Sequence, residues 1–223
     1  MLTTHIPGYP RIGARRELKF ALEACWRGET DDAHLLRTGS ELRAAHWRRQ
    51  REAGLSLVTA GDFSFYDPML DTLVLLGCLP PRFGFDLQQL TLRQYFELAR
   101  GNTGQPALEM TKWFDTNYHY LVPELSPQTR FDGGPDWYFE HIAEALAAGH
   151  PVKPVLIGPV TFLRLAKAGG GADRLALLEP LARAYARILG RLRGMGIEWV
   201  QIDEPALCLE LEPAWLDAFD RAY

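Results

Sequence analysis

The chain has 223 residues, of which 47% are hydrophobic and 23% are charged, and its formal net charge at pH 7 is -4. This length and balance are typical of a globular domain with one sizeable hydrophobic core. The net charge gives no general reason to expect nucleic acid or an anionic membrane as a partner. No stretch approaches the roughly 18 apolar residues of a membrane span, and Pro7, Gly8 and Pro10 interrupt the apolar core that a targeting peptide would need.

The three cysteines, Cys25, Cys78 and Cys208, lie far apart in the sequence and show no CxxC spacing. Scattered single cysteines are typical of small buried side chains or free thiols, whereas a zinc site needs clustered ligands. The sequence therefore predicts a cytoplasmic protein with reduced cysteines and no metal site in this chain.

Short apolar runs alternate with amphipathic segments along the chain. In chain order, the pattern first predicts a strand over Leu2–Ile6, helices over Arg15–Trp26 and Asp31–Ala53, and a strand over Leu55–Ala60. It next predicts a helix over Leu70–Leu79, a strand over Ala107–Trp113, a helix over Trp137–Ala148 and a strand over Pro154–Ile157. The last predicted elements are a helix beginning at Phe162, a helix over Leu175–Met195, a strand over Trp199–Ile202 and a helix over Ala214–Ala222. Repeated strand-then-helix order favours parallel βα units, and hence an α/β fold of the (β/α)8 barrel type.

The strand count falls short of a closed barrel. About five βα units are predicted, whereas a (β/α)8 barrel needs eight. A parallel sheet left open would expose an unpaired edge. We therefore expect an incomplete barrel from a longer protein, with self-association through the exposed sheet edge as one way to cover that edge.

The first candidate site follows the turn-rich segment 7–13. If a helix starts near Ala14, Arg16 and Lys19 share one of its faces close to the first-turn backbone N–H groups. Cations near the positive end of a helix are unfavourable unless an anion is present, so this pattern suits carboxylates or phosphate. The alternative is a solvated helix face with extended basic side chains.

The second candidate is the aromatic-rich segment Glu109–Tyr120, which also contains Lys112 and His119. An aromatic wall with a few polar groups suits a planar heterocycle or a sugar. A buried loop whose polar groups satisfy one another explains the same composition equally well.

Carboxylates follow two of the predicted strands. Asp203 and Glu204 end one strand, and Asp62 and Asp67 follow another. Such pairs could act as general acid and base in a barrel enzyme, or they could cap the following segments and fix the strand ends. No G-x-S-x-G, P-loop, HExxH or dinucleotide glycine motif is present to decide between these readings.

Several of these motifs also resemble a family. Gly8-Tyr9-Pro10-Arg11-Ile12-Gly13 followed by Arg16-Glu17-Leu18-Lys19 resembles the opening of the cobalamin-independent methionine synthases. The resemblance continues through Gly61-Asp62-Phe63, Glu109–Tyr120, Lys153–Thr161 and Glu198–Leu207, and so extends over essentially the whole chain. These enzymes are 5-methyltetrahydropteroyltriglutamate–homocysteine methyltransferases, which make methionine without vitamin B12.

The resemblance implies a specific role for this part of the protein. Family members consist of two (β/α)8 barrels, and the amino-terminal barrel contributes basic residues to the polyglutamate tail of the folate. That role falls here on Arg16, Glu17, Leu18, Lys19 and Lys112. Residues 1–223 then form a truncated amino-terminal barrel that contains no catalytic residue, and Asp203 is a remnant of duplication.

The resemblance places the chemistry elsewhere in the protein. The family holds zinc in a carboxyl-terminal barrel, where homocysteine binds as a thiolate and attacks the methyl group of 5-methyltetrahydropteroyltri-L-glutamate. The expected partners of this chain are therefore the folate and that missing barrel, and the chain alone is expected to be inactive. The alternative is a non-catalytic folate- or anion-binding scaffold protein of the same fold.

Overall fold

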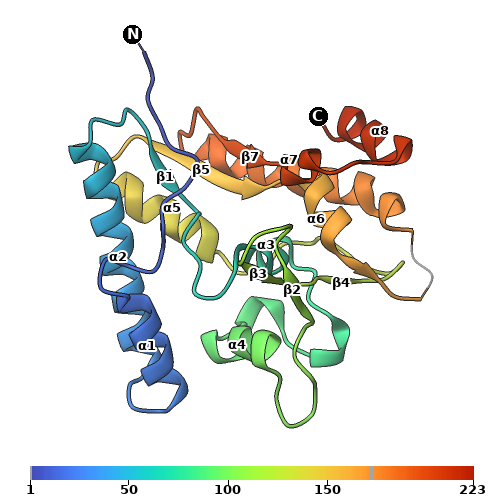
Figure 1. Cartoon of the computed structure of the whole chain (residues 1–223), viewed down its shortest axis with the longest axis horizontal. Helices are drawn as coiled ribbons and strands as arrows, with labels where there is room; N and C mark the ends of the chain where they lie inside the picture. Colours follow the sequence, from blue (N-terminus) through green and yellow to red (C-terminus); the bar gives the residue numbers. More distant parts are fainter. Residues whose placement is uncertain (1, 171–172) are drawn as a thin grey trace. The chain divides into compact units, whose positions relative to one another are not determined.

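The main sheet contains three strands in the order β1-β5-β7 (Figure 1). The computed structural model describes residues 2–170 and 173–223. β1 covers Val58–Ala60, β5 covers Val152–Ile157 and β7 covers Gln201–Asp203. β1 runs parallel to β5, with Val58 opposite Val152 and Ala60 opposite Pro154. Every residue of β1 is buried, as expected for a parallel strand covered on both faces.

The chain divides into two compact units, each built from separate stretches of sequence. Unit 1 comprises Met1–Phe65, Tyr138–Val155 and Ile197–Gln201. Unit 2 comprises Tyr66–Trp137, Leu156–Gly196 and Ile202–Tyr223.

In unit 1, the helix α2 (Asp32–Glu52) packs both on β1 and on the neighbouring helix α1 (Glu17–Trp26). The two helices lie side by side in Figure 1. α2 begins where the Asp31 carboxylate accepts a hydrogen bond of 2.8 Å from the His34 backbone N–H. The buried Trp47 donates its indole N–H to the backbone oxygen of Thr59 over 2.9 Å, which fixes α2 against the strand. The unit also contains most of α5 (Trp137–Ala147).

Unit 2 contains several helices and two small sheets. Its helices are α3 (Pro68–Leu76), α4 (Leu92–Arg100), α6 (Pro159–Leu165), α7 (Leu178–Gly194) and α8 (Pro213–Ala222), with short 3₁₀ turns at Pro81–Phe83, Leu87–Gln89, Arg174–Leu177 and Pro205–Cys208. β2 (Met110–Lys112) pairs antiparallel with β3 (His119–Leu121), and β4 (Glu124–Leu125) pairs parallel with β6 (Lys167–Ala168). Helix α4 was not predicted from the sequence, although Thr91 and Gln94 form a complete capping box at its start.

The predicted α/β class and parallel strand pairing are confirmed, but two of the five predicted barrel strands are not present as such. Residues 2–6 form no strand, and the backbone there is irregular. Met110–Lys112 is a strand, but it belongs to an exposed antiparallel hairpin. The described residues therefore contain no closed barrel. None of the helices among them has the length and apolar content needed to cross a membrane.

Candidate functional site

The segment that contains Arg16 and Lys19 lies where α1 begins. Arg16 is the N-cap residue and has φ 64°, a left-handed backbone conformation that is unfavourable for any residue with a side chain. Its side chain is exposed and forms no ion pair with any other residue in 2–170 and 173–223. Lys19, also exposed, lies 3.7 Å from Glu23 in an i,i+4 pair. Exposed pairs of this kind contribute only about 0.3–0.5 kcal/mol.

Glu17 lies within the same first turn of α1. Its Oε2 accepts a hydrogen bond of 2.9 Å from the Arg15 backbone N–H. Its own backbone N–H and then that of Arg15 hold the pKa of this carboxyl below the usual range. Leu18 is buried, and its N–H bonds to the backbone oxygen of Ile12 over 3.2 Å. The first turn thus has two exposed cations, a carboxylate that already accepts hydrogen bonds from the backbone, and a buried leucine that packs in the core.

Lys112 is on β2, in unit 2. All three residues of β2 are exposed. Lys112 lies opposite His119 in the β2–β3 hairpin and forms no ion pair within the part of the chain that the structure describes. Beyond Lys112 the hairpin turns through Phe114, whose φ is 51°. The predicted aromatic wall is small: Trp113 makes edge-to-face contacts with Phe114 and Tyr120 at centroid distances of 5.1 and 5.6 Å.

Asp62 and Asp67 have structural roles that the sequence left open. In unit 1, Asp62 accepts hydrogen bonds from the Tyr9 backbone N–H at 2.8 Å and the Thr59 hydroxyl at 2.7 Å. In unit 2, Asp67 caps α3 through the Met69 and Leu70 N–H groups and accepts a third bond from the N–H of Leu121 on β3. Burial, followed by the nearby Asp71, raises the pKa of Asp67 to about 7.

The Asp203–Glu204 pair also has a structural arrangement. Glu204 accepts bonds of 3.0 and 2.7 Å from the backbone N–H groups of Val160 and Thr161, at the start of α6. The Tyr223 hydroxyl donates to the same carboxylate over 2.8 Å. The backbone oxygen of Asp203 accepts a bond of 2.7 Å from Gly158 N–H. These contacts support the capping role that the sequence offered as an alternative to acid–base chemistry.

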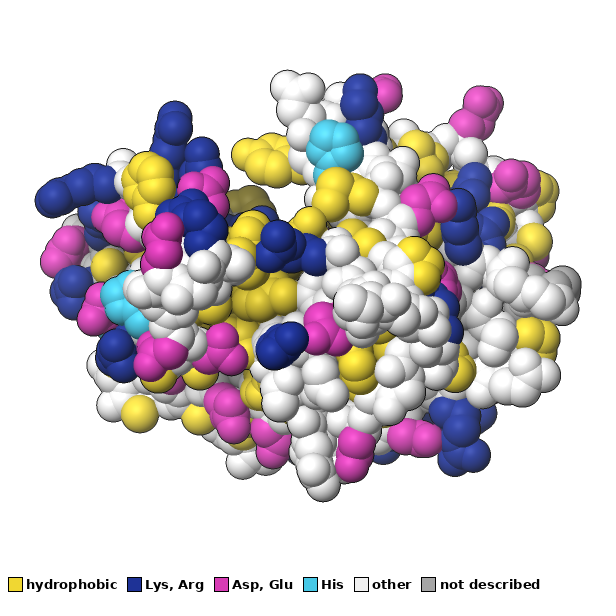
Figure 2. Space-filling view, turned by 90° about the horizontal axis from the view of Figure 1, so that it is seen from below, with side chains coloured by type: hydrophobic (Ala, Val, Ile, Leu, Met, Phe, Trp, Pro, Cys, Tyr) yellow, Lys and Arg dark blue, Asp and Glu magenta, His cyan; other side chains and the backbone are white. Residues whose placement is uncertain are grey.

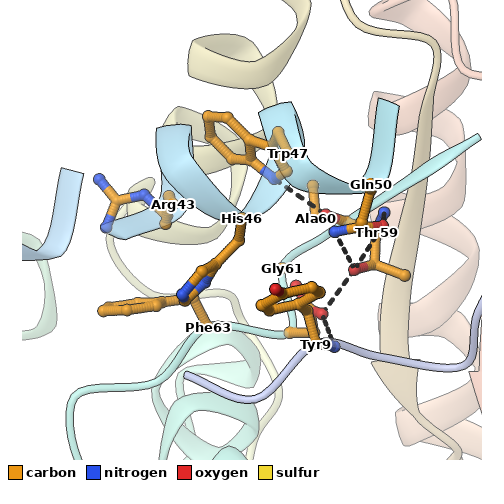
Figure 3. A pocket seen from close by; sticks show the side chains of 10 residues that line it. Tyr9, Arg43, His46, Trp47, Gln50, Thr59, Ala60, Gly61 and Phe63 are labelled. Carbon is orange, nitrogen blue, oxygen red and sulfur yellow. Dashed lines mark hydrogen bonds between the residues drawn. The ribbon is translucent and has the colours of Figure 1, made fainter. Parts of the chain in front are cut away.

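A small cavity in unit 1 lies between α2, the end of β1 and the segment around Tyr9 (Figure 3). The lining residues are Tyr9, Arg43, His46, Trp47, Gln50, Thr59, Ala60, Gly61, Asp62 and Phe63. Its volume of about 10 Å³ is room for roughly one water molecule, so no part of a folate fits inside. Gln50 and Thr59 are joined there by hydrogen bonds, and the Tyr9 ring stacks on His46 at 4.5 Å.

Two buried cations were not singled out from the sequence. Arg43 is 8% exposed and donates its Nε–H to Glu144 over 2.8 Å. Lys153, on β5, is 4% exposed and contacts the amino-terminal segment. The charge of Lys153 within a short apolar strand could have marked it, whereas Arg43 lies in a helix rich in exposed charged residues, where one more arginine gives no signal.

The described residues do not fit a zinc ion. No group of three or more His, Cys, Asp or Glu side chains in that part of the chain could hold a metal. The three cysteines are unpaired thiols. The face in Figure 2 shows Lys and Arg interspersed with Asp and Glu, so this face carries no extended surface of one charge.

Comparison with known proteins identifies the family. Residues 3–223 match the family model described as "Cobalamin-independent synthase, N-terminal domain". The chain is 63% identical over 224 residues to 5-methyltetrahydropteroyltriglutamate–homocysteine methyltransferase of Paraburkholderia xenovorans (strain LB400), a match that covers 100% of this chain and 29% of that protein. Proteins of the same name from Ralstonia pickettii (strain 12J) and Burkholderia thailandensis are 58% and 59% identical over 227 residues, again with all of this chain covered and 29% and 30% of the relatives. The chain thus spans under a third of the length of these relatives, and it belongs to the amino-terminal domain family of the cobalamin-independent methionine synthases.

Proposed function

We propose that this chain binds the polyglutamate tail of 5-methyltetrahydropteroyltri-L-glutamate. The residues assigned to the tail are Arg16, Glu17, Leu18, Lys19 and Lys112. The names of the relatives state that those proteins act on the triglutamate form of the folate and on homocysteine. A triglutamate carries several carboxylates at neutral pH, so its recognition calls for several cations.

The backbone conformation of two residues carries the assignment. Among the residues that the structure describes, the non-glycine positions with positive φ are Arg16 and Phe114. One is itself an assigned cation, and the other lies two residues after Lys112. A left-handed backbone costs a residue with a side chain about 1–2 kcal/mol, and such strain concentrates at binding and active sites. One strained position is thus an assigned residue, and the other lies close in sequence to the assigned Lys112.

The chemistry of the side chains supports the same assignment. Arg16 and Lys112 are exposed and form no ion pair with the residues that the structure describes, so binding an anion would not first break an internal ion pair. Lys19 would give up only its weak pair with Glu23. Arg16 offers a planar guanidinium that can hold a carboxylate through two hydrogen bonds.

In this proposal, the methyl transfer is carried out by the whole protein. The remaining part of the protein would complete the barrel, hold zinc and bind homocysteine as a thiolate, the form that acts as nucleophile. This chain would act with that part in the cytoplasm, contribute tail binding to a transferase of methionine biosynthesis, and be inactive alone. Separated from it, the chain could associate with itself through the open sheet edge.

Titration of the 223-residue chain with pteroyltri-γ-glutamate and with pteroylmonoglutamate tests the tail assignment. We expect the triglutamate to bind more tightly, and its affinity to fall with rising salt because exposed charges are screened. Arg16→Gln, Lys19→Gln and Lys112→Gln should each weaken triglutamate binding by about three- to tenfold, since one charge-assisted contact contributes roughly 1 kcal/mol.

Arg48→Gln is the matched control, because Arg48 is an exposed cation on α2 outside the assigned segments. It should leave the affinity unchanged. Equal affinity for the two ligands, or equal losses from all four substitutions, would remove the tail assignment.

A further inference from the structure

The segment that leads into Arg16 is held in place by side chains from the sheet. Residues 2–16 form neither helix nor strand. Near the start, the backbone oxygen of Thr4 accepts bonds from the N–H groups of Ser56 and Leu57 at 2.9 and 3.2 Å. Farther along, the contacts come from the side chains of Lys153 on β5, Gln201 on β7 and Asp62, which follows the end of β1. The course of this segment therefore depends on a few polar groups in unit 1.

Lys153 makes the central contacts of this arrangement. Its ammonium group donates a hydrogen bond of 2.9 Å to the backbone oxygen of Ile6 and lies 3.1 Å from Nδ1 of His5. It also donates to Oε1 of Gln201, on β7. Gln201 in turn donates from Nε2 to the backbone oxygen of Pro7 over 2.7 Å. The ammonium group of Lys153 and the side-chain amide of Gln201 thus contact three successive residues of the segment, residues 5 to 7.

Asp62 fastens the next part of the segment. Its carboxylate accepts a hydrogen bond of 2.8 Å from the Tyr9 backbone N–H. Burial raises the pKa of Asp62, whereas the positive charge of Lys153 favours the ionised form. Four residues after Tyr9 the chain reaches Gly13, with φ 84°, and the backbone oxygen of Gly13 accepts a bond of 3.2 Å from the Arg16 N–H. The fastened stretch therefore ends directly before the turn that sets the left-handed conformation of Arg16.

The burial of Lys153 is expensive and needs a reason. An ammonium group taken out of water loses several kcal/mol of solvation, and an apolar side chain of similar length would pack in a parallel strand without that loss. The contacts of Lys153 described above are to residues 5 and 6 of the irregular segment and to Gln201, which itself bonds to Pro7 of that segment. Fixing the course of residues 5–9 is therefore what the charge provides and an apolar residue would not.

We propose that Lys153, assisted by Gln201 and Asp62, is a positioning residue for the polyglutamate site. It holds the segment that delivers Arg16 and Lys19 to the start of α1, and it does not itself contact the ligand. This inference rests on the proposed tail binding, and its test separates the two.

Lys153→Met in the full 223-residue chain removes the charge and keeps a similar side-chain length. We expect the affinity advantage of pteroyltri-γ-glutamate over pteroylmonoglutamate to fall by about tenfold, while monoglutamate affinity stays unchanged. An unaltered advantage in the folded variant would overturn the positioning role and leave the tail assignment standing. Absence of any advantage in the unsubstituted chain would instead overturn the tail assignment.

Amide hydrogen exchange gives a readout that needs no ligand. Lys153→Met should speed exchange at the Arg16 and Leu18 amides, whose bonds to Gly13 and Ile12 form the turn before α1. Exchange at Leu121, on the β2–β3 hairpin of unit 2, should stay the same. Faster exchange throughout both units would indicate a general loss of stability and contradict positioning.

Two further variants keep the test decisive. Lys167→Met is the matched control, because Lys167 is an exposed lysine paired with Glu109 in unit 2 and should alter neither readout at α1. If Lys153→Met does not fold, Gln201→Met removes the contact to Pro7 and one acceptor of the Lys153 ammonium, but it keeps the charge and the bond of Lys153 to Ile6. It should shift both readouts in the same direction by a smaller factor, and a variant without effect would overturn the proposal.

Discussion

The two segments assigned to the polyglutamate tail are held by different physical means. In unit 1, an irregular stretch is held by the side chains of the buried Lys153 and the half-buried Asp62 before it reaches Arg16. In unit 2, Lys112 lies in a hairpin whose backbone pairs with itself, and the hairpin is joined to α3 through Asp67. Segments held by side chains depend on individual charges, whereas a hairpin retains most of its backbone bonds when one side chain changes. The two units should therefore respond differently to substitution and to pH.

Removal of the Asp67 or the Asp62 carboxylate should give the largest difference between the two units. Asp67→Ala leaves the buried N–H groups of Met69, Leu70 and Leu121 without their acceptor, at a cost of about 3 kcal/mol in the free energy of unfolding. Asp62→Ala affects the Tyr9 N–H and the Thr59 hydroxyl, and the cost should be nearer 1–2 kcal/mol. Urea unfolding of both variants measures the difference.

Asp67→Asn is the control for that comparison, since its amide oxygen can still cap α3. It should restore much of the stability lost in Asp67→Ala. A larger loss at Asp62 than at Asp67 would show that the irregular segment of unit 1, and not the hairpin connection, is the more stabilising arrangement.

Acidification should affect the two units in opposite directions. In unit 2, the folded-state pKa of Asp67 is about 7, above the ordinary 3.8, so between these values the folded state binds more protons than the unfolded one. Its contribution to stability is therefore largest below pH 3.8 and is lost as the pH rises toward 7. In unit 1, burial lowers the pKa of His46 to about 4 and that of His141 to about 3, against an ordinary 6.5. Their contribution is lost as the pH falls from 6.5 toward these values.

Differences between variants and the unsubstituted chain isolate these effects. The stability of Asp67→Asn relative to the original chain should increase as the pH rises from 4 to 7. The relative stability of His46→Gln should decrease over the same range, because the original chain gains stability there and the variant does not. Parallel pH profiles for the two variants would contradict the assignment of opposite signs.

The same contrast explains what the sequence could and could not predict. Helices α1, α2 and α7 and strand β5 were found because their hydrophobic spacing is set by one buried face, a local property. The predicted strand at Leu2–Ile6 is wrong because backbone groups of that stretch bond to Ser56 and Lys153, which lie far away in the sequence. Arg16 was chosen for its charge, but its left-handed conformation depends on the turn at Gly13 and carries no signal in the arginine itself.

Relief of backbone strain should separate the two positive-φ positions. Arg16→Gly removes a strained exposed side chain and should raise the free energy of unfolding by up to about 1 kcal/mol. It should also weaken pteroyltri-γ-glutamate binding, because the cation is lost. Phe114→Gly relieves similar strain but also loses the edge-to-face contact with Trp113, so we expect no net gain. Thermal unfolding of the two variants checks this, and a destabilised Arg16→Gly variant would argue against stored strain at α1.

The smallest effect concerns the internal partner of Lys19. Glu23→Gln breaks the 3.7 Å pair and should lower the free energy of unfolding by no more than about 0.5 kcal/mol. Because Lys19 is then free to face a ligand carboxylate, and one nearby negative charge is gone, pteroyltri-γ-glutamate should bind slightly more tightly at low salt. Glu179→Gln is the matched control: it breaks another exposed i,i+4 pair, with Arg183 in unit 2, away from the assigned residues. If only Glu23→Gln binds pteroyltri-γ-glutamate more tightly, the tail lies within reach of α1. An equal gain in both variants would mean that the change in net charge, and not the position of Glu23, causes the effect.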